Sequence, residues 1–349
     1  MSLGHPSPHA SFVTTPEQLA DALHLPLEPL RSVHTVYPLR ISTYYLDLIK
    51  RHGLPLWRQA VPDPQELDDT VGLVDPLDEE NLSPVPCLVH KYPDRALFLV
   101  TNECAMYCRF CTRKRKVGKA EMHIDDATIA AGIEYLRRTP AISDVLVSGG
   151  DPFMLSVDRL EGILKALRSI PSIATIRIGT RVPCTLPSRV TPRLAAMLKR
   201  YHPLYINTHF NHPAEITAEA EQACARLADA GIPLGCQTVL LRGVNDTPEI
   251  MRELLYRLIR IRVKPYYLFQ ADLTKGTSHF RTTVDAGLAL MRQLIGHVTG
   301  IAVPTYALDA PGGGGKIPLT PEYIQQIGAS LEFMTYRGDC CSYPNTILP

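Results

Sequence analysis

The chain has 349 residues, 45% of them hydrophobic and 20% charged, which suits two modest domains or one large α/β domain and argues against bulk disorder. Lys and Arg total 36 and Asp and Glu total 35, so the net charge of +1 lacks the basic footprint of a dedicated nucleic-acid binder. No apolar run approaches the roughly 20 residues that cross a bilayer, and residues 1–12 lack the pattern of a signal peptide. Nine cysteines in such a chain indicate thiols kept reduced, so we expect a cytoplasmic protein. From the balanced charge and the lack of long apolar runs, we expect neither nucleic-acid nor membrane partners.

The first 95 residues predict a helical, proline-rich N-terminal region that packs on a core or on another subunit. Short helices are expected at 16–23 and 43–52, and Asp63-Pro64 begins another with acidic residues in its first turn. From residue 96 apolar runs alternate with amphipathic helices. The predicted strands lie at 96–101, 145–147, 175–178, 204–207, 234–241, 266–269 and 301–308. The predicted helices lie at 126–138, 157–168, 192–200, 218–230, 248–259 and 284–295.

Alternating strands and helices imply parallel βαβ units and an α/β fold. About six repeats before a final strand are enough for most of a barrel, and an open doubly wound sheet is the competing architecture. In both architectures functional groups collect at the C-terminal ends of the strands. We therefore expect an N-terminal region over 1–95, a barrel over 96–300 and a C-terminal segment over 301–349.

Three cysteines, Cys104, Cys108 and Cys111, form the spacing C-x3-C-x2-C directly after the first predicted strand. Thiolates this close in sequence can hold a [4Fe-4S] cluster with one iron left open for an exogenous ligand. A structural zinc usually has four ligands and no fourth is evident nearby, so zinc and a group of free cysteines are the weaker alternatives. The other cysteines are interpreted mostly as small buried hydrophobes, with metal binding or oxidation open for Cys340 and Cys341.

Two glycine-containing segments follow later strands. Ser148-Gly149-Gly150-Asp151 lies one βα unit after the cysteines and would, alone, be only a turn. Residues 309–316 contain four consecutive glycines before Lys316, and Ala310 and Ile317 exclude a P-loop there. The residues alone leave two interpretations open: a flexible linker, or a loop that holds a Schiff-base lysine over a pocket.

Taken together, these segments resemble the lysine 2,3-aminomutase family within the radical S-adenosylmethionine (SAM) superfamily. The resemblance runs from about residue 92 to 343 and includes 207–213, 243–246, 276–282 and 302–305, whereas 338–343 departs from the family's pattern. It implies a partial (β/α)6 radical-SAM barrel with a helical N-terminal region and a C-terminal extension that binds pyridoxal phosphate (PLP). The implied cofactors are a [4Fe-4S] cluster, SAM and PLP.

The resemblance also assigns roles to single residues. Cys104, Cys108 and Cys111 bind the cluster, and Lys316 forms the Schiff base with PLP. The remaining PLP contacts are Lys91, Tyr92 and Arg95, and Lys91 stands where the family has an arginine. The SAM contacts are Ser148, Gly149, Gly150, Asp151, His209 and Gln237, although His209 can equally be an ordinary hydrogen-bonded histidine. Arg113 binds the substrate carboxylate, while Asp272 and Asp309 bind its remote amino group; alone, either aspartate is more often a turn residue.

The implied activity is that of an isomerase that moves the α-amino group of L-lysine to the β-carbon and gives β-lysine. L-arginine is the alternative substrate, because two carboxylates favour a remote cation over an acidic or small aliphatic side chain. The alternatives of other classes are a radical SAM enzyme without PLP, an iron–sulfur or zinc binding module, and a translation-factor-modifying relative. The expected partners are the amino acid substrate, an electron donor such as flavodoxin or ferredoxin, and further copies of the chain in a homo-oligomer.

Overall fold

The computed structural model describes residues 11–346. Most of the segment predicted to lack a signal peptide, residues 1–10, lies outside the described residues. A nine-stranded sheet organises the fold in the order β11-β10-β9-β8-β7-β6-β5-β4-β3. Strands β4 to β10 are parallel neighbours, and β3 and β11 pair antiparallel with them at the two edges. The strands are β3 (Leu88–Tyr92), β4 (Arg95–Leu99), β5 (Asp144–Ser148), β6 (Thr175–Gly179), β7 (Leu204–Thr208), β8 (Leu234–Leu240), β9 (Val263–Gln270), β10 (Thr305–Ala310) and β11 (Gly315–Pro318). The alternation predicted from residue 96 onward is therefore confirmed.

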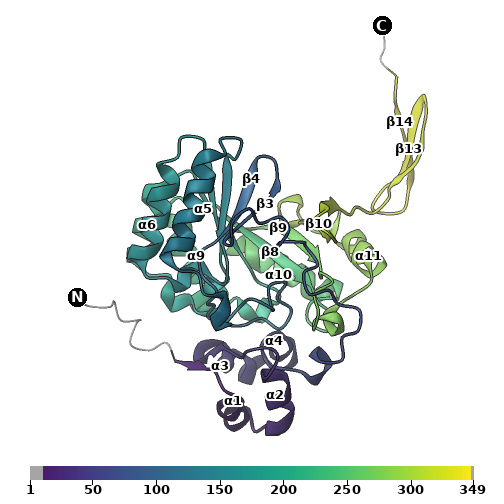
Figure 1. Cartoon of the computed structure of the whole chain (residues 1–349). Coiled ribbons are helices and arrows are strands. Elements are labelled where there is room, and N and C mark those ends of the chain that lie inside the picture. Colours follow the sequence, from purple (N-terminus) through teal and green to yellow (C-terminus); the bar gives the residue numbers. More distant parts are fainter. Residues whose placement is uncertain (1–10, 347–349) are drawn as a thin grey trace.

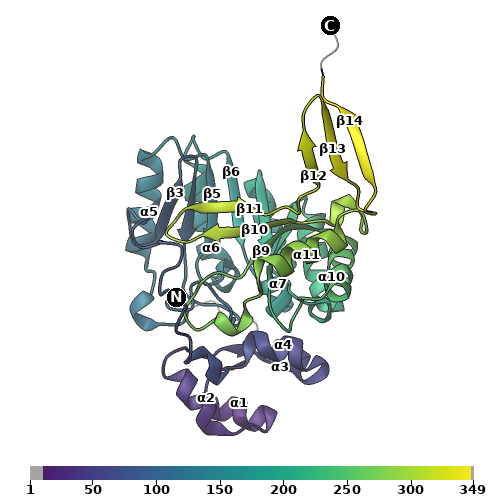
Figure 2. The same cartoon turned by 90° about the vertical axis from the view of Figure 1, so that its right-hand side faces the viewer.

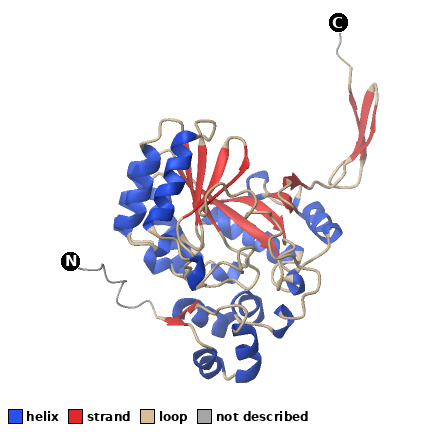
Figure 3. Cartoon of the chain, in the orientation of Figure 1, coloured by secondary structure: helices blue, strands red, loops and turns tan. Residues whose placement is uncertain are grey.

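Helices that connect the parallel strands cover the outer face of the sheet (Figure 1 and Figure 3). They are α5 (Asp126–Arg138), α6 (Val157–Arg168), α7 (Val182–Thr185), α8 (Pro192–Leu198), α9 (Ala218–Asp229), α10 (Pro248–Arg260) and α11 (Val284–Leu294). Short hydroxyl or carboxyl side chains such as Asp125, Ser156 and Thr217 cap the N-termini, because they accept the otherwise unpaired amide hydrogens of the first turn. Short 3-10 turns are η1 (Pro64–Glu66), η2 (Ala120–Met122), η3 (Pro152–Met154), η4 (Pro187–Arg189), η5 (Lys199–Tyr201), η6 (Pro213–Glu215), η7 (Ser278–Phe280) and η8 (Gly300–Ala302).

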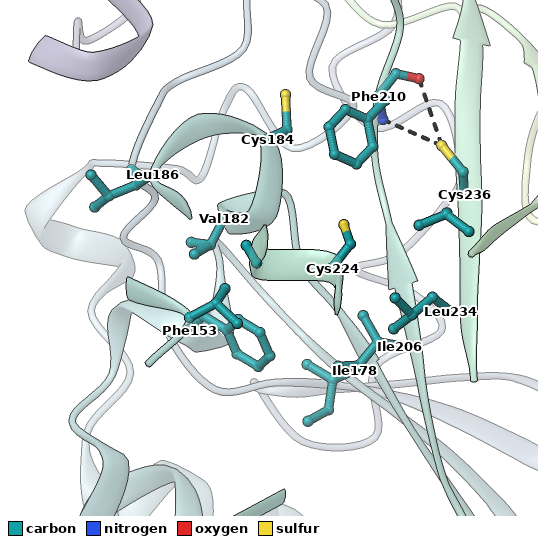
Figure 4. Packing of buried hydrophobic residues seen from close by; sticks show 14 of the residues in the cluster. Phe153, Ile178, Val182, Cys184, Leu186, Ile206, Phe210, Cys224, Leu234 and Cys236 are labelled. Carbon is teal, nitrogen blue, oxygen red and sulfur yellow. Dashed lines mark hydrogen bonds between the residues drawn. The ribbon is translucent and has the colours of Figure 1, made fainter. Parts of the chain in front are cut away.

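The main core lies between the sheet and these outer helices. Along β8, Leu234, Cys236, Thr238 and Leu240 are buried, while the partly exposed residues that alternate with them face the other side of the sheet, as a two-residue period requires. Figure 4 shows Cys224 of α9 and Cys236 packed among aliphatic side chains. The prediction of small buried hydrophobes is confirmed for Cys87, Cys184, Cys224 and Cys236.

The N-terminal region is helical and packs against the barrel (Figure 1). It contains β1 (Phe12–Val13), α1 (Pro16–Leu23), α2 (Leu27–His34), β2 (Ile41–Ser42), α3 (Thr43–His52) and α4 (Leu54–Ala60). The helices predicted at 16–23 and 43–52 are confirmed, and the start at Asp63 is the 3-10 turn η1 with a complete capping box. Buried hydrogen bonds fix the packing: Ser42 donates to the carbonyl of Thr185 at 2.5 Å, and Tyr45 donates to Glu215 at 2.6 Å.

The C-terminal residues form a separate antiparallel sheet. Its strands are β12 (Ile324–Ile327), β13 (Ser330–Met334) and β14 (Cys340–Pro344), and Figure 2 shows this sheet extending away from the barrel. The last predicted barrel strand, at 301–308, was placed too early, because residues 300–302 form η8 and β10 begins at Thr305. Within residues 11–346 no helix combines the length and apolar character that a bilayer crossing requires.

The two edges of the nine-stranded sheet approach each other through side chains. The hydroxyl of Tyr92 on β3 accepts a hydrogen bond from the backbone nitrogen of Lys316 on β11 at 2.9 Å. Lys91, also on β3, reaches Asp309 of β10 at 3.8 Å. The sheet therefore curls into a nearly closed barrel, which confirms the expected partial barrel over the open doubly wound alternative.

Candidate active site

The three clustered cysteines lie in the loop that leaves β4. Cys104, Cys108 and Cys111 all line one cavity of about 40 Å³. Burial, followed by the nearby Asp151 carboxylate, raises the pKa of Cys104 well above its usual range, and burial together with Cys108 raises the pKa of Cys111 to about 11. These thiols therefore ionise readily only beside a cation, which is the environment that a metal centre supplies.

The spacing of the thiols suits a multi-iron cluster. Within residues 11–346 no three His, Cys, Asp or Glu side chains converge on a point where a single ion would bind. A [4Fe-4S] cluster does not require that convergence, because each thiolate binds a different iron. The three cysteines thus fit a cluster better than a single zinc ion.

The glycine element after β5 packs directly on the cysteine loop. A Cβ atom on Gly149, whose φ is +128°, would lie 2.2 Å from the carbonyl oxygen of Thr101, and one on Gly150 would lie 2.3 Å from that of Glu103. Only glycine permits this approach. Ser148 ends β5 directly before these glycines and is partly exposed.

The carboxylate of Asp151, predicted to contact SAM, faces into the protein. It accepts hydrogen bonds from the Thr180 hydroxyl at 2.7 Å and from the backbone nitrogens of Phe153, Arg181 and Val182 at 3.0, 2.7 and 3.1 Å. Burial raises its pKa to about 6. In this structure Asp151 anchors the start of α7.

His209 and Gln237 follow or belong to neighbouring strands. The imidazole of His209 stacks on Phe110 with ring centroids 5.5 Å apart, and its Nε2 is buried without a hydrogen-bond partner in the described residues. Burial, aided by the charge of Arg181, holds the pKa of His209 well below its usual range, so the ring is neutral. Gln237 lies on β8 and, unlike Cys236, points to the partly exposed side of the sheet.

The lysine after the glycine run lies on β11 and pairs with an aspartate on β10. In the hairpin register Asp309 lies opposite Lys316, and the tight turn uses Gly312 and Gly313 at positive φ. The Lys316 ammonium is 2.9 Å from Oδ2 and 3.1 Å from Oδ1 of Asp309. The ring of Phe269 on β9 lies below it, with the centroid 5.0 Å from Nζ.

Basic and aromatic residues of the opposite edge strand surround this lysine. The hydroxyl of Tyr92 contacts the backbone of Lys316, as described above, and the guanidinium of Arg95 stacks 3.8 Å over the Tyr92 ring. Both Lys91 and Lys316 pair with the Asp309 carboxylate. The predicted PLP residues therefore gather where the two edges of the barrel meet.

The second aspartate, Asp272, lies in the loop after β9 beside the cysteine loop. The hydroxyl of Thr112, one residue beyond Cys111, donates to Oδ2 of Asp272 at 2.6 Å. Burial raises the pKa of Asp272 to about 6. The hydrogen bond from Thr112 acts to lower that pKa, and the charge of Asp309 acts to raise it further. One hydrogen bond thus joins the cysteine loop to a candidate substrate ligand.

Arg113 forms a two-point ion pair with the buried Glu79 of the N-terminal region. Its Nε lies 3.1 Å from Oε2 and its Nη2 lies 2.6 Å from Oε1. Burial alone would lower the pKa of Arg113, but the carboxylate of Glu79 outweighs it and raises that pKa. The guanidinium is therefore charged and fixed in orientation.

Four residues of this region were not predicted from the sequence. Glu79 and Arg181 are charged residues whose partners lie far away in the chain. Thr112 follows Cys111 and belongs to none of the predicted ligand sets. Phe269 alternates with Tyr267 along β9, and this two-residue period could have placed it in the barrel interior beside Lys316.

Two family models match parts of the chain, and a solved structure resembles it in part. Residues 98–255 match the family model described as the radical SAM superfamily, and residues 291–346 match the model described as lysine-2,3-aminomutase. Membership of the radical SAM superfamily brings a [4Fe-4S] cluster and SAM as cofactors. The solved structure of a radical SAM methyltransferase from Sphaerobacter thermophilus is 18% identical, with a TM-score of 0.46 over 63% of this chain and 68% of that one.

Three curated relatives match most of the chain. L-lysine 2,3-aminomutase of Fusobacterium nucleatum is 48% identical over 90% of this chain and 73% of its own length. The enzyme of the same name from Methanococcus maripaludis is 50% identical over 88% and 72%. Glutamate 2,3-aminomutase of Clostridioides difficile is 48% identical over 89% and 74%. The chain therefore belongs to the lysine 2,3-aminomutase family of radical SAM isomerases.

Proposed function

We propose that the chain moves the α-amino group of L-lysine to the β-carbon and thereby gives β-lysine. The observation that carries this proposal is a grouping of charges: Asp272 is close enough to Asp309, Lys316 and Arg113 for each to shift its pKa. Two carboxylates and one arginine complement a substrate that has a carboxylate at one end and a cation at the other. L-arginine remains the alternative substrate.

Each charged group has a separate task in binding. Arg113 binds the substrate carboxylate through Nη1, since its pair with Glu79 engages Nε and Nη2. Asp272 binds the remote ammonium group and is held in place by Thr112. Asp309 contributes to the same negative field while it contacts Lys316. A substrate that is anchored at both ends presents one β-hydrogen in a fixed direction. The protein thereby controls which hydrogen a radical can remove.

The residues around Lys316 suit PLP. The primary amine of Lys316 is the group that PLP binds covalently, Lys91 and Arg95 are cations for its phosphate, and Tyr92 and Phe269 offer aromatic surface. Cys104, Cys108 and Cys111 suit the cluster. Ser148, Gly149, Gly150 and His209 lie at or just beyond strand ends beside the cysteine loop, whereas Gln237 lies in the middle of β8. When bound, the cluster and SAM supply a carbon-centred radical, and PLP supplies a ring that delocalises the unpaired electron.

The choice of lysine over glutamate rests on the two carboxylates. A relative that is 48% identical is a glutamate 2,3-aminomutase, so overall identity does not select the substrate. A glutamate side chain would meet the like charges of Asp272 and Asp309, a repulsion that costs several kcal/mol in a desolvated site. A cationic side chain would instead satisfy both.

We also propose the partners and setting of the reaction. Reduction of the cluster requires an electron donor such as flavodoxin or ferredoxin. The sheet of β12 to β14 exposes Ile327 and Tyr343 by 69% and 65%, which supports assembly into a homo-oligomer. All nine cysteines are free thiols, which supports a reducing compartment such as the cytoplasm.

The proposal is tested by anaerobic incubation of the reconstituted enzyme with reductant, SAM, PLP and single amino acids, followed by identification of the products. Lysine should give β-lysine, and Asp272→Asn should raise the KM strongly, whereas Asp21→Asn on the exposed face of α1 should not change it. A preference for arginine would keep the pocket and change the substrate. A preference for glutamate or alanine would refute the assigned pocket.

The role of Lys316 has its own test. Borohydride reduction of the PLP-loaded chain should attach the pyridoxyl group to the peptide that contains Lys316. Lys91 is the informative competitor, because its ammonium also lies within 4 Å of Asp309, at 3.8 Å. Recovery of the label on Lys91, Lys264 or Lys275 would refute the assignment.

A further inference from the structure

We propose that Arg181 is a positioning residue for the iron–sulfur cluster: its guanidinium donates a hydrogen bond to the sulfur of Cys108 and raises the cluster's reduction potential. Nη1 of Arg181 lies 2.8 Å from Sγ of Cys108. The inference rests on the proposed role of Cys108 as a cluster ligand. It adds a residue that touches no substrate and sets how easily the cluster accepts an electron.

Arg181 is fixed by several contacts. Its Nη2 donates to Gln59 at 2.6 Å and to Glu215 at 2.8 Å, and its own backbone nitrogen donates to Asp151 at 2.7 Å. The guanidinium also lies 5.1 Å from the centroid of the Phe110 ring. Only 9% of the side chain is exposed, so solvent does not screen its charge.

The anchor of Arg181, Glu215, is itself saturated with donors. Its Oε1 accepts from the hydroxyl of Tyr45 at 2.6 Å, and its Oε2 accepts from the backbone nitrogens of Asn211 and His212 at 2.6 and 3.0 Å. A carboxylate with this many donors is held in one orientation. Arg181 therefore keeps Nη1 directed at Cys108.

The orientation of the guanidinium favours the sulfur contact over complete pairing. Nε of Arg181 is buried and has no hydrogen-bond partner among residues 11–346. A guanidinium placed only to hold the fold together would gain from pairing that nitrogen as well. The arrangement leaves Nε unpaired and uses Nη1 on the thiol.

The expected effect on the cluster follows from charge. A hydrogen bond and a buried positive charge at a ligating thiolate withdraw electron density and stabilise the more negative, reduced cluster. Glu215 cancels part of that charge, but the guanidinium is the group that touches the sulfur, so it dominates there. Removal of Arg181 should therefore make the cluster harder to reduce.

The test is a redox titration of the reconstituted cluster followed by electron paramagnetic resonance, with iron content measured in parallel. Arg181→Gln should keep its irons and show about a tenfold lower ratio of reduced to oxidised cluster at a fixed potential, which is a shift of about 59 mV for one electron. Arg181→Lys retains the charge and should shift less. Arg189→Gln is the matched control, since Arg189 donates to the carbonyls of Phe153, Met154 and Leu155 and touches no cysteine.

The variants also separate a structural role from a redox role. If Arg181→Gln does not fold because Glu215 loses its partner, the double variant Arg181→Gln with Glu215→Gln removes both charges. It should still lower the potential, but by less than the single variant, because the opposing charge of Glu215 is lost as well. A potential equal to that of the wild type in the folded variants would overturn the inference. A wild-type chain that takes up no cluster, or a Cys108→Ala chain that keeps an unaltered one, would instead refute the assignment of the ligand.

Discussion

The two-point pair between Glu79 and Arg113 connects the N-terminal region to the candidate substrate site, across 34 positions of sequence. Glu79 is almost fully buried, whereas 21% of the Arg113 side chain is exposed. Glu79 therefore binds Nε and Nη2 of the guanidinium, and this contact also fixes the direction of Nη1. The orientation of Arg113, which is predicted to bind the substrate carboxylate, therefore depends on Glu79, a residue outside the barrel.

Glu79→Gln should loosen Arg113 and raise the KM for lysine about tenfold with a smaller change in kcat, because a mobile guanidinium binds a carboxylate less well. The folded chain should also lose about 2 kcal/mol, less than a fully buried pair because Arg113 is partly exposed. Steady-state kinetics and urea unfolding measure the two effects. Glu80→Gln provides the control, because Glu80 is 62% exposed and pairs with Arg115. Equal behaviour of the two variants would contradict the orienting role.

Asp272→Asn should stabilise the apoprotein at pH 7. The folded-state pKa of Asp272 is about 6, above the ordinary 3.8, so the folded state resists ionisation. Below pH 4 the carboxyl is neutral in both states and costs nothing. As the pH rises from 4 to 6 the unfolded chain loses its proton first, and roughly 2 to 3 kcal/mol of stability is lost. The Asp272→Asn variant should not lose this stability between pH 4 and pH 7. Denaturation of both proteins at pH 4 and pH 7 measures the difference. A variant that is less stable than the wild type at pH 7 would argue against the raised pKa.

The same ionisation predicts how substrate binding depends on pH. Only the carboxylate form of Asp272 attracts an ammonium group, so the KM for lysine should fall as the pH rises through about 6 and then level off. In Asp272→Asn the KM should be high and should lack this change. Kinetics between pH 5.5 and 8 would test this, and an unchanged pH profile in the variant would assign the titration to another group.

Replacement of any one of Cys104, Cys108 or Cys111 with Ala should prevent stable assembly of the cluster and abolish SAM cleavage. Anaerobic reconstitution of the wild type should give roughly four irons per chain. Cys340→Ala is the natural control, because Cys340 is an exposed thiol on β14. Deoxyadenosine release at the wild-type rate by all three single variants would exclude the assigned ligands.

Gly149→Ala should destabilise the chain by at least about 2 kcal/mol, because a side chain is strained at a φ of +128° and would collide with the carbonyl of Thr101. The displaced cysteine loop should also retain less iron. Gly162→Ala, on α6 with open space around the new methyl group, should stabilise the chain by about 0.5 to 1 kcal/mol. Thermal unfolding of the two variants compares them directly, and a neutral Gly149→Ala would show that the loops can separate.

The sequence predicted those elements whose signal is local. The helix at 126–138 has a capping Asp125 and a regular apolar face, and its bounds agree with α5. By contrast, β11 was missed, because a four-residue segment after a glycine run becomes a strand only through pairing with β10. Helix α4 was not predicted, although Pro55 lies in its first turn, where proline is well tolerated.

For the site, the residue identities were accessible from the sequence but the partnerships were not. Asp309 and Lys316 were both named, yet their ion pair follows from the register of the hairpin, which the turn determines. Arg181 lies 73 positions from Cys108, and its role depends on how the strand ends come together in three dimensions. Distant contacts of single charged residues leave no periodic trace in a sequence.

The contact between Tyr92 and Lys316 also constrains the order of events as the chain is made. These residues are 224 positions apart, and the strands that bring them together are the first and last of the barrel sheet. Seven parallel strands must be laid down between them, and such long-range pairing is slow because it closes large loops. A nascent chain can assemble its cysteine loop early but completes the lysine site last. The proposed cluster ligands thus precede the proposed PLP lysine by most of the length of the protein.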